Sequence, residues 1–236
     1  MGEQASRAVL AYLKALYLLG EEASRSGTGA QLGLAQRLST SAIALRMGVS
    51  APSATNMLKR LAARDLVTYE PYKGASLTQR GRDVALEIVR HHRLLETYLV
   101  EALSVPWDEA HAEAEALEGD LSEALEERIC AALGDPQFDP HGHPIPAKNG
   151  AMPKISTSRR SLWDVADGEA ARIEQVPDSH PDALRYLGEV GVLPRVMVTV
   201  VSRGPIGGPL FVAIKADIET APVALSKEIA EAIWVQ

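Results

Sequence analysis

Apolar positions in the first part of the chain predict helices followed by a hairpin. The predicted helices and strands are at residues 8–19, 42–47, 51–64, 66–69 and 75–78. The polar segment 21–33 contains glycine and serine and is predicted to be a loop. Gly48 separates the second helix from the third, and Ser50 is placed to cap the third. Helix, tight turn, capped helix and hairpin in this order are typical of a winged helix-turn-helix.

The rest of the chain changes character twice. Helical periodicity continues through the segments 79–103, 107–117 and 120–133. Proline and glycine then dominate residues 139–158, which is typical of a linker. Beyond it, short β-type runs alternate with Gly-containing turns, and a short helix follows. The predicted strands are 195–201, 209–215 and 218–223, and the predicted helix is 225–233. This pattern fits a small, strongly bent β-barrel.

Charge is distributed unevenly along the chain, whose formal net charge is −7 at pH 7. Residues 1–83 hold 11 Lys/Arg against 6 Asp/Glu, whereas residues 84–145 hold 3 against 14. A basic N-terminal module is suited to face phosphates, and an acidic middle region is suited to gather cations. The asymmetry therefore carries more information about partners than the total does.

The composition is that of an ordinary soluble globular protein, with 46% hydrophobic and 23% charged residues. The sequence has no apolar run of about 18 residues, the length of a membrane-spanning helix. Its N-terminus has neither the basic nor the apolar region of a secretory signal. A single cysteine, Cys130, excludes a disulfide framework or a thiolate zinc cluster within one chain. We therefore expect a cytoplasmic protein without a membrane partner.

The second helix of the predicted helix-turn-helix offers small and amide side chains that can reach base edges. Candidates for base contacts are Ala51, Ser53 and Asn56, and candidates for phosphate contacts are Lys59, Arg60 and Lys73. An asparagine can bond an adenine through two hydrogen bonds. Double-stranded DNA is the favoured partner, because the basic charge and the wing agree with it. The alternative is a winged helix that makes protein contacts.

Histidines and carboxylates recur at helical spacing in the acidic middle region. His92 and Glu96 are four residues apart on one predicted helix, so they share a face. His111, Glu115 and Glu118 share a face of the next helix. If the two faces meet, these groups repel one another and lose hydration unless a divalent cation lies between them. The alternative is a solvated acidic helix face.

The donors in this set are nitrogen and hard oxygen without sulfur, which suits Mn²⁺ or Fe²⁺ better than a structural zinc site. His91 points about 100° away from its neighbour on the helix and is expected at the surface. His141 and His143 form a His-x-His pair among prolines, for which a structural turn is favoured over a metal site. The sequence contains no Gly-rich phosphate loop and no nucleophile elbow.

Six segments together form a specific signature: 12–17 (YLKALY), 50–53 (SAPS), 77–81 (LTQRG), 90–96 (RHHRLLE), 110–118 (AHAEAEALE) and 139–146 (DPHGHPIP). In combination they resemble the diphtheria toxin repressor family of iron- and manganese-dependent transcriptional regulators. The resemblance covers nearly all of residues 8–146 and, more loosely, the C-terminal β segment.

The resemblance implies a mainly α protein with a small β content. The implied parts are a winged helix-turn-helix DNA-binding domain (1–78), a helical dimerisation and metal-binding domain (79–139), a Pro/Gly-rich linker (140–158) and an SH3-like β-barrel (159–236). It also implies a homodimer that binds a palindromic DNA operator. The residues that would open its recognition helix are Ser50, Ala51, Pro52 and Ser53.

Two neighbouring metal positions per subunit are implied as well. By position, His92, Glu96 and His111 match the first, which we call the His92 position. Glu115 and Glu118 match ligands of the other, which we call the Glu115 position. Glu115 stands where iron-type members have a cysteine and manganese-type members a glutamate. This favours Mn²⁺, with Fe²⁺ as the second candidate.

This chain departs from the family pattern at the Glu115 position. Ala11 and Gly119 stand where the family has ligands, and Lys14 replaces a carboxylate of the manganese type. Candidates for additional ligands are Asp120, His180 and Asp182. The sequence therefore predicts one complete and one incomplete metal position.

These inferences predict a manganese-responsive transcriptional regulator, not an enzyme, in which metal binding to the dimerisation domain favours operator binding. One alternative is a winged-helix regulator that senses an organic ligand independently of metal. Another is a metal-dependent hydrolase built on the histidine and carboxylate cluster. The hydrolase would need an open metal position and a cleft, and nothing in the sequence marks a nucleophile or a pocket for a small organic substrate.

Overall fold

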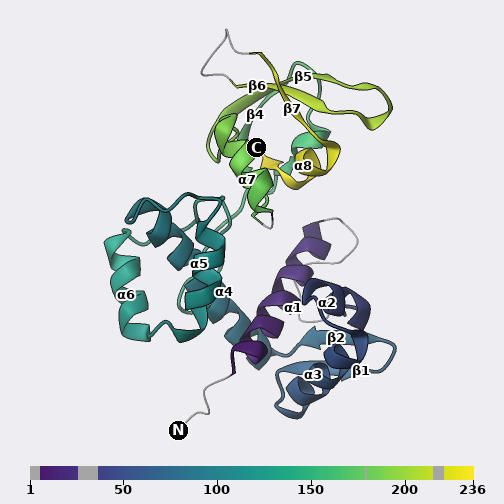
Figure 1. Ribbon diagram of the computed structural model, residues 1–236, viewed down its shortest axis with the longest axis vertical. Coiled ribbons are helices and arrows are strands. Elements are labelled where there is room, and N and C mark those ends of the chain that lie inside the picture. Colours follow the sequence, from purple (N-terminus) through teal and green to yellow (C-terminus); the bar gives the residue numbers. More distant parts are fainter. Residues whose placement is uncertain (1–5, 26–36, 179, 215–220) are drawn as a thin grey trace. The chain divides into compact units, whose positions relative to one another are not determined.

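The structure is a computed structural model that describes residues 6–25, 37–178, 180–214 and 221–236. The chain divides into two compact units (Figure 1), Met1–His91 with Pro146–Ala151 and His92–Ile145 with Met152–Gln236. The boundary between the units falls within one continuous helix, α4 (Gln79–Glu101). No helix among the described residues is both long and apolar enough to cross a membrane.

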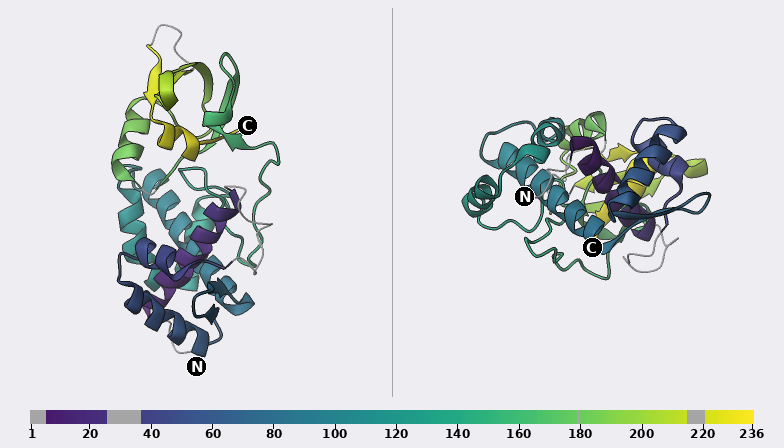
Figure 2. Two further views of the ribbon diagram at one scale, coloured as in Figure 1. Left: turned by 90° about the vertical axis from the view of Figure 1, so that its right-hand side faces the viewer. Right: turned by 90° about the horizontal axis from the view of Figure 1, so that it is seen from below.

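The first unit combines helices with a two-stranded hairpin (Figure 2). Its elements before α4 are α1 (Arg7–Arg25), α2 (Thr40–Arg46), α3 (Ala51–Ala63), β1 (Val67–Glu70) and β2 (Gly74–Leu77). Ser39 caps α2 and Ser50 caps α3, because each side chain accepts a hydrogen bond from a backbone N–H in the first turn. The predicted order of helices and hairpin is confirmed.

Leucines and isoleucine from the three helices form the core of this unit. The fully buried side chains of greatest volume here are Leu13, Leu16, Ile43, Leu58 and Leu61. The hairpin is antiparallel, with Val67 opposite Leu77. Gly81 lets the first turn of α4 approach the hairpin closely, since a Cβ atom there would lie 1.8 Å from the Leu66 carbonyl oxygen.

The second unit begins with the helical segment that carries the candidate metal ligands. After α4 come α5 (Ala110–Leu117), a 3-10 turn η1 (Glu118–Asp120) and α6 (Glu123–Ala132), which Ser122 caps. These helices enclose a small apolar core. Its buried members are Leu94, Leu95, Leu99, Ala110, Ala114, Ile129, Cys130 and Ile145.

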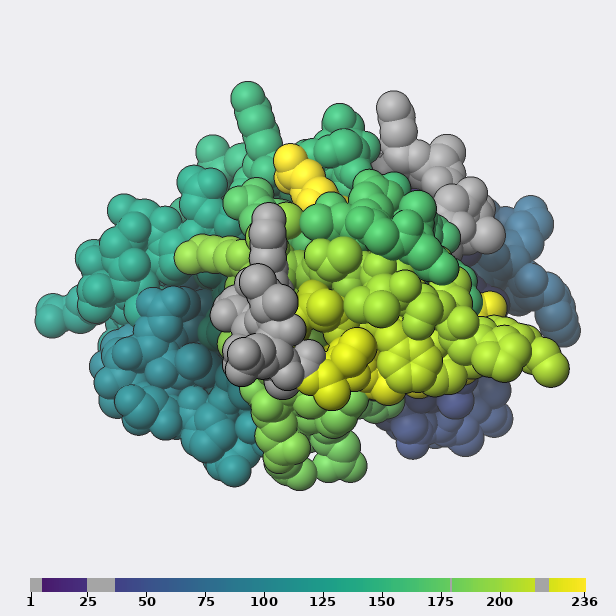
Figure 3. Space-filling model, turned by 90° about the horizontal axis from the view of Figure 1, so that it is seen from above, coloured from purple at the N-terminus to yellow at the C-terminus, as the bar shows by residue number. Residues whose placement is uncertain are grey.

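The C-terminal part of the second unit is a sheet with flanking helices. Its elements are β3 (Arg160–Ser161), η2 (Leu162–Asp164), β4 (Ala170–Gln175), α7 (Pro181–Glu189), β5 (Met197–Arg203), η3 (Pro205–Gly207), β6 (Leu210–Ile214), β7 (Val223–Leu225), α8 (Lys227–Ala232) and β8 (Trp234–Val235). The sheet order is β3-β8-β4-β5-β6-β7, and all neighbouring strands are antiparallel. The hairpin of β5 and β6 projects from this region in both Figure 1 and Figure 3. Pairing among the described strands leaves β3 and β7 at the edges, so closure into a barrel stays a prediction.

Several boundaries differ from the sequence predictions. Helix α1 continues to Arg25, into the predicted loop 21–33, and the rest of that loop lies outside the described residues. The predicted strand 218–223 lies largely outside them too, and β7 begins only at its end. Helix α7 and strands β3, β4 and β8 were not predicted. The start of the Pro/Gly-rich segment is also different, because residues 141–146 are buried rather than extended through solvent.

Candidate functional site

Helix α3 has one buried and one exposed face. Ala54, Leu58 and Leu61 face the core. The predicted DNA-contact residues on this element are all exposed: Ser50, Ala51, Pro52, Ser53, Asn56, Lys59 and Arg60. The predicted contact residues at α3 are therefore open to a partner, while the apolar residues of the helix face the core.

The serines at the start of α3 are already engaged in capping. The Ser50 hydroxyl oxygen accepts a hydrogen bond from the Ser53 backbone N–H at 3.4 Å and lies 3.0 Å from the Ser53 hydroxyl. Asn56, one turn further on, is exposed. Its amide is therefore the better candidate for reading a base edge, because it can donate and accept at once.

The wing residue Lys73 is exposed but paired. Its ammonium group lies 2.8 Å from Glu70 Oε2, and Glu70 also binds the Arg37 guanidinium group. Hydrogen bonds from Lys73 and then Arg37 lower the pKa of the Glu70 carboxyl. A phosphate contact by Lys73 would therefore have to exchange one anionic partner for another.

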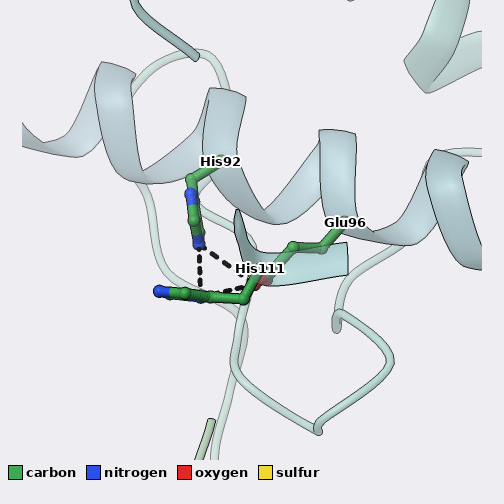
Figure 4. A group of neighbouring side chains, drawn as sticks. All are labelled: His92, Glu96 and His111. Atoms are coloured by element: carbon green, nitrogen blue, oxygen red, sulfur yellow. Dashed lines mark hydrogen bonds and ion pairs between the residues drawn. The ribbon is translucent and has the colours of Figure 1, made fainter. Parts of the chain in front are cut away.

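His92, Glu96 and His111 meet in one cluster (Figure 4). His92 and Glu96 come from consecutive turns of α4, and His111 comes from α5. His92 Nε2 lies 3.0 Å from Glu96 Oε1 and 3.1 Å from His111 Nδ1, and His111 Nδ1 lies 2.9 Å from the same oxygen. Three candidate ligand atoms thus face one point, which is the arrangement that the spacing predicts.

Glu96 is a charged carboxylate at full burial, with 0% of its side chain exposed. Burial by itself raises the pKa of this carboxyl, but the charge of His92 and the hydrogen bonds from His111 and His92 hold the pKa well below its usual range. The other oxygen of Glu96, Oε2, has no hydrogen bond and lies 4.0 Å from His141 Nδ1. Glu96 therefore connects the first cluster to a second one.

The second cluster is built on the turn Asp139–His143. Asp139 Oδ1 accepts hydrogen bonds from the backbone N–H groups of His141 and His143, both at 2.9 Å. Gly142 has a φ of +87°, and a Cβ atom there would lie 2.0 Å from the Glu174 carbonyl oxygen. The predicted structural turn is present, and this same turn brings the side chains of Asp139, His141 and His143 together.

One contact determines the tautomer of the neutral His141 ring. Nε2 of His141 donates to the carbonyl oxygen of Trp107 at 3.1 Å, since a carbonyl can only accept. The lone pair is then on Nδ1, which faces Glu96 Oε2. His141 is 0% exposed, so this nitrogen is shielded from bulk water.

Asp178 adds a carboxylate from the loop between β4 and α7. Its Oδ2 lies 3.7 Å from His143 Nδ1. Although burial raises the pKa of Asp178, the His143 charge lowers it to about 2. Burial conversely lowers the pKa of His143, but Asp178 and Asp139 together raise it above its ordinary value.

Buried ligand-type atoms without a hydrogen bond converge here. Within the described residues they include Glu96 Oε2, Asp139 Oδ2, His141 Nδ1 and His143 Nδ1. Leaving a buried polar atom unpaired is costly, and native structures rarely do so without a reason. Asp139 Oδ2 has ion-pair contacts only, with His143 Nδ1 at 3.4 Å and Arg93 Nε at 3.9 Å. Imidazole nitrogen and carboxylate oxygen together are a suitable donor set for a divalent cation. The residues present therefore fit a metal ion.

Other predicted ligands lie elsewhere. Glu118 is buried against the far side of the His92 ring. The exposed ones are Glu115, Asp120, His180 and Asp182. Asp182 pairs with Arg185 at 3.2 Å. The expectation that His91 lies at the surface was wrong, because His91 is 5% exposed.

Sequence reasoning missed Asp139 and Asp178, and for His141 and His143 it favoured a structural turn over a metal site. The alternating Asp-x-His-x-His spacing was the available signal for the first three. No local signal marked Asp178, which lies just before the proposed but exposed His180.

Three family models match the chain in succession. They describe an iron dependent repressor, N-terminal DNA binding domain (residues 6–75), an iron dependent repressor, metal binding and dimerisation domain (78–147), and a FeoA domain (160–236). Each matches a different one of the regions described above.

Individual relatives agree with these matches. The iron-dependent repressor IdeR of Mycobacterium leprae (strain TN) is 31% identical over 205 residues, which is 82% of this chain and 86% of the relative. A solved manganese-dependent transcriptional repressor in complex with manganese is 38% identical, with 96% of this chain and 98% of that chain covered and a TM-score of 0.81. ScaR with bound Cd²⁺ is 28% identical over 97% of this chain and 98% of its own, with a TM-score of 0.76. These relatives give no support to the metal-independent alternative. The chain belongs to the diphtheria toxin repressor family of metal-dependent transcriptional regulators.

Proposed function

We propose that the protein is a manganese-responsive transcriptional regulator in which metal binding favours binding to operator DNA. The observation that carries this proposal is the convergence of four buried donor atoms without hydrogen bonds beside the cluster of His92, Glu96 and His111. The metal dependence named for the relatives supports it. Mn²⁺ is favoured because carboxylate and imidazole donors suit it and no thiolate takes part, and Fe²⁺ is the second candidate.

We assign two neighbouring metal positions that share Glu96. The His92 position has His92, Glu96 and His111 as ligands. The second, which we call the His143 position, has Glu96, His141, His143 and Asp178, with Asp139 at its edge. Glu115, Asp120, His180 and Asp182 remain predictions from the sequence. A divalent cation in these positions would supply the positive charge that the gathered carboxylates lack.

Helix α4 ties the metal ligands to the DNA-binding unit through the chain itself. It starts immediately after the wing, at Gln79, and carries His92 and Glu96 in its second half. Side chains that are fixed around a cation restrict this helix, which is how binding in one unit can bias the other. A tenfold change in DNA affinity requires about 1.4 kcal/mol of preferential metal binding to the DNA-competent state.

The exposed face of α3 is the surface that we assign to the major groove. Asn56 would read a base, and Lys59 and Arg60 would contact phosphates. Two copies of this face are needed for a palindromic operator, so we propose a homodimer through the helical region. Leu103, Leu117 and Leu125 are exposed there and are candidates for the subunit contact.

The test compares DNA binding by the chelator-stripped protein with and without Mn²⁺, Fe²⁺ or Zn²⁺. A duplex selected from random DNA by the Mn²⁺-loaded protein serves as the probe, and fluorescence anisotropy measures affinity. We expect Mn²⁺ to raise the affinity at least about tenfold. Glu96→Gln should abolish this response, because Glu96 belongs to both positions.

Glu101→Gln is the matched control, since Glu101 is an exposed carboxylate at the end of the same helix. It should respond to Mn²⁺ as the unmodified protein does. Equal DNA affinity with and without metal in the unmodified protein would refute the proposed function.

A further inference from the structure

His92 has a partner at each of its ring nitrogens. Nε2 faces Glu96 and His111, as described above. On the opposite side of the ring, Nδ1 lies 2.5 Å from Glu118 Oε2. His92 and Glu118 are 4% and 7% exposed, so water does not compete strongly for this contact.

The contact with Glu118 determines which nitrogen of the neutral ring carries the proton. An ionised carboxylate can only accept a hydrogen bond, so Glu118 requires the proton on Nδ1, whereas Glu96 Oε1, near the other ring nitrogen, can accept from His111 Nδ1 at 2.9 Å instead. The lone pair is then on Nε2, which is the nitrogen that faces the other two ligands of the His92 position. Metal-binding histidines use such a partner at the second nitrogen to fix the tautomer and the ring orientation.

Local structure separates Glu118 from Glu115. Helix α5 ends at Leu117, and Glu118, which begins the 3-10 turn, contacts the same His92 ring as His111 does. Glu115 is exposed, whereas Glu118 is buried against His92. Ala11 and Gly119 offer no side-chain donors to a Glu115 position either.

We propose that Glu118 is a positioning residue for His92 and not a ligand of a further metal ion. This inference rests on the proposed function, because it assigns Glu118 a role toward the His92 position. The carboxylate holds the imidazole with Nε2 directed at Glu96 and His111. Its negative charge makes the Nε2 lone pair more basic and therefore a stronger metal ligand. The number of metal ions bound per chain is then independent of Glu118.

The first experiment uses the full-length, metal-free protein and detects the neutral form of the His92 imidazole. Nitrogen-15 NMR of labelled histidine distinguishes the two tautomers of His92. We expect the Nδ1–H form in the unmodified protein. Glu118→Ala should shift His92 toward a mixture of tautomers, and Glu118→Gln should retain Nδ1–H because the amide oxygen still accepts. An unchanged tautomer in Glu118→Ala would overturn the proposal.

The second experiment titrates Mn²⁺ into the same variants by calorimetry. Glu118→Ala should weaken binding roughly 10- to 100-fold, the usual effect of losing a partner of a ligating histidine, with the same number of ions per chain. Glu118→Gln should restore most of the affinity. Glu113→Gln, an exposed carboxylate on α5, is the control and should bind as the unmodified protein does.

A metal ligand and a positioning residue give different results in this titration. If Glu118 were a ligand, Glu118→Gln would remove one ion per chain, and that result would overturn the proposal. If the unmodified protein bound no Mn²⁺ while the tautomer still depended on Glu118, the proposed function would fail. The effect of Glu118 on His92 would then stand by itself.

Discussion

The winged-helix unit and the metal-binding region differ in how far their polar groups are hydrogen-bonded. In the first unit, Ser39 and Ser50 cap helices, and the Thr78 hydroxyl donates to the Asp65 carbonyl oxygen at 2.7 Å while accepting from the Gly81 N–H at 3.0 Å. In the second, one buried nitrogen or oxygen atom in each of Glu96, Asp139, His141 and His143 has no hydrogen bond among the described residues.

The first unit is therefore expected to be stable without a ligand, whereas the metal-binding region has buried atoms that a ligand would bind. The first unit satisfies its polar groups through local contacts around a leucine core, so its stability should not need a cation. The clusters around Glu96 hold buried atoms without hydrogen bonds, so cation binding there should add stability by mass action.

Leu58→Ala should produce the largest loss of stability, because Leu58 is 0% exposed in the core of the first unit. Such a truncation costs about 2–5 kcal/mol. All three tryptophans, Trp107, Trp163 and Trp234, belong to the second unit. In urea, circular dichroism should therefore show earlier loss of helix, while the tryptophan fluorescence transition and Mn²⁺ affinity remain unchanged.

The control for this substitution is Leu45→Ala, since Leu45 lies on α2 and is 84% exposed. It should change stability by no more than about 0.5 kcal/mol. If Leu58→Ala moved the fluorescence transition as far as the helix signal, the two units would unfold together and the contrast would be lost.

Gly142→Ala should have the largest effect on metal affinity among substitutions that remove no ligand. The new Cβ atom would lie 2.0 Å from the Glu174 carbonyl oxygen, at a φ of +87°, so the turn that carries His141 and His143 must shift. We expect Mn²⁺ binding, measured by calorimetry, to weaken roughly 100-fold, the upper range for lost supporting contacts.

Gly134→Ala provides the matched comparison. Gly134 also has a positive φ, +71°, but nothing lies within 4 Å of its Cβ position. It should cost about 1–2 kcal/mol of backbone strain and leave Mn²⁺ affinity unchanged. Equal losses of affinity in the two variants would mean that strain alone, and not the displaced turn, controls the site.

The same contrast explains what could be predicted from sequence. The Ser50 cap, the hairpin turn and the shared face of His92 and Glu96 depend on residues within a few positions of each other, so local rules suffice. The same rule put Glu115 and Glu118 on one face with His111. Glu115 lies inside α5 but is exposed, whereas Glu118, just past the end of α5, contacts His92.

Asp178 could not have been found by spacing, since long-range backbone contacts bring it to His143. The Val176 N–H donates to the His141 carbonyl oxygen at 2.9 Å, which fixes the chain just before Asp178 against the histidine turn. Such a contact depends on the fold of the C-terminal region, where β4 and α7 were not predicted. The acidic composition indicated a cation site, but not which carboxylates complete it.

The stability of the metal-free protein and its affinity for Mn²⁺ should change with pH in opposite directions. The pKa of His143 is raised, with Asp178 and Asp139 overcoming the effect of burial. Its contribution to stability is thus complete below the unfolded pKa of about 6.5 and is lost as pH rises through the folded value. Metal binding needs the neutral ring, so Mn²⁺ affinity should rise with pH, about tenfold per unit below that pKa for one displaced proton.

Thermal unfolding in chelator and calorimetry at pH 6, 7 and 8 measure these two trends. Asp178 does not interfere, because its pKa of about 2 confines the loss of its contribution to acid pH. Glu70 in the first unit also has a lowered pKa, so its contribution changes only as pH falls below this range. Parallel trends in stability and affinity would contradict the assignment of His143 as a ligand.

The smallest expected effects come from two equivalent caps, one in each unit. Ser50 accepts from the Ser53 N–H at 3.4 Å to cap α3, and Ser122 accepts from the Leu125 N–H at 3.3 Å to cap α6. Replacing either serine with alanine should cost about 1 kcal/mol of stability. Only Ser50→Ala should also weaken DNA binding, by up to about fivefold at saturating Mn²⁺, because this cap orders the end of the helix that faces the groove. Anisotropy on the selected duplex measures that difference. Equal losses of DNA affinity would show that α3 has no closer relation to DNA than α6 does, and they would remove the reason for assigning its exposed face to the major groove.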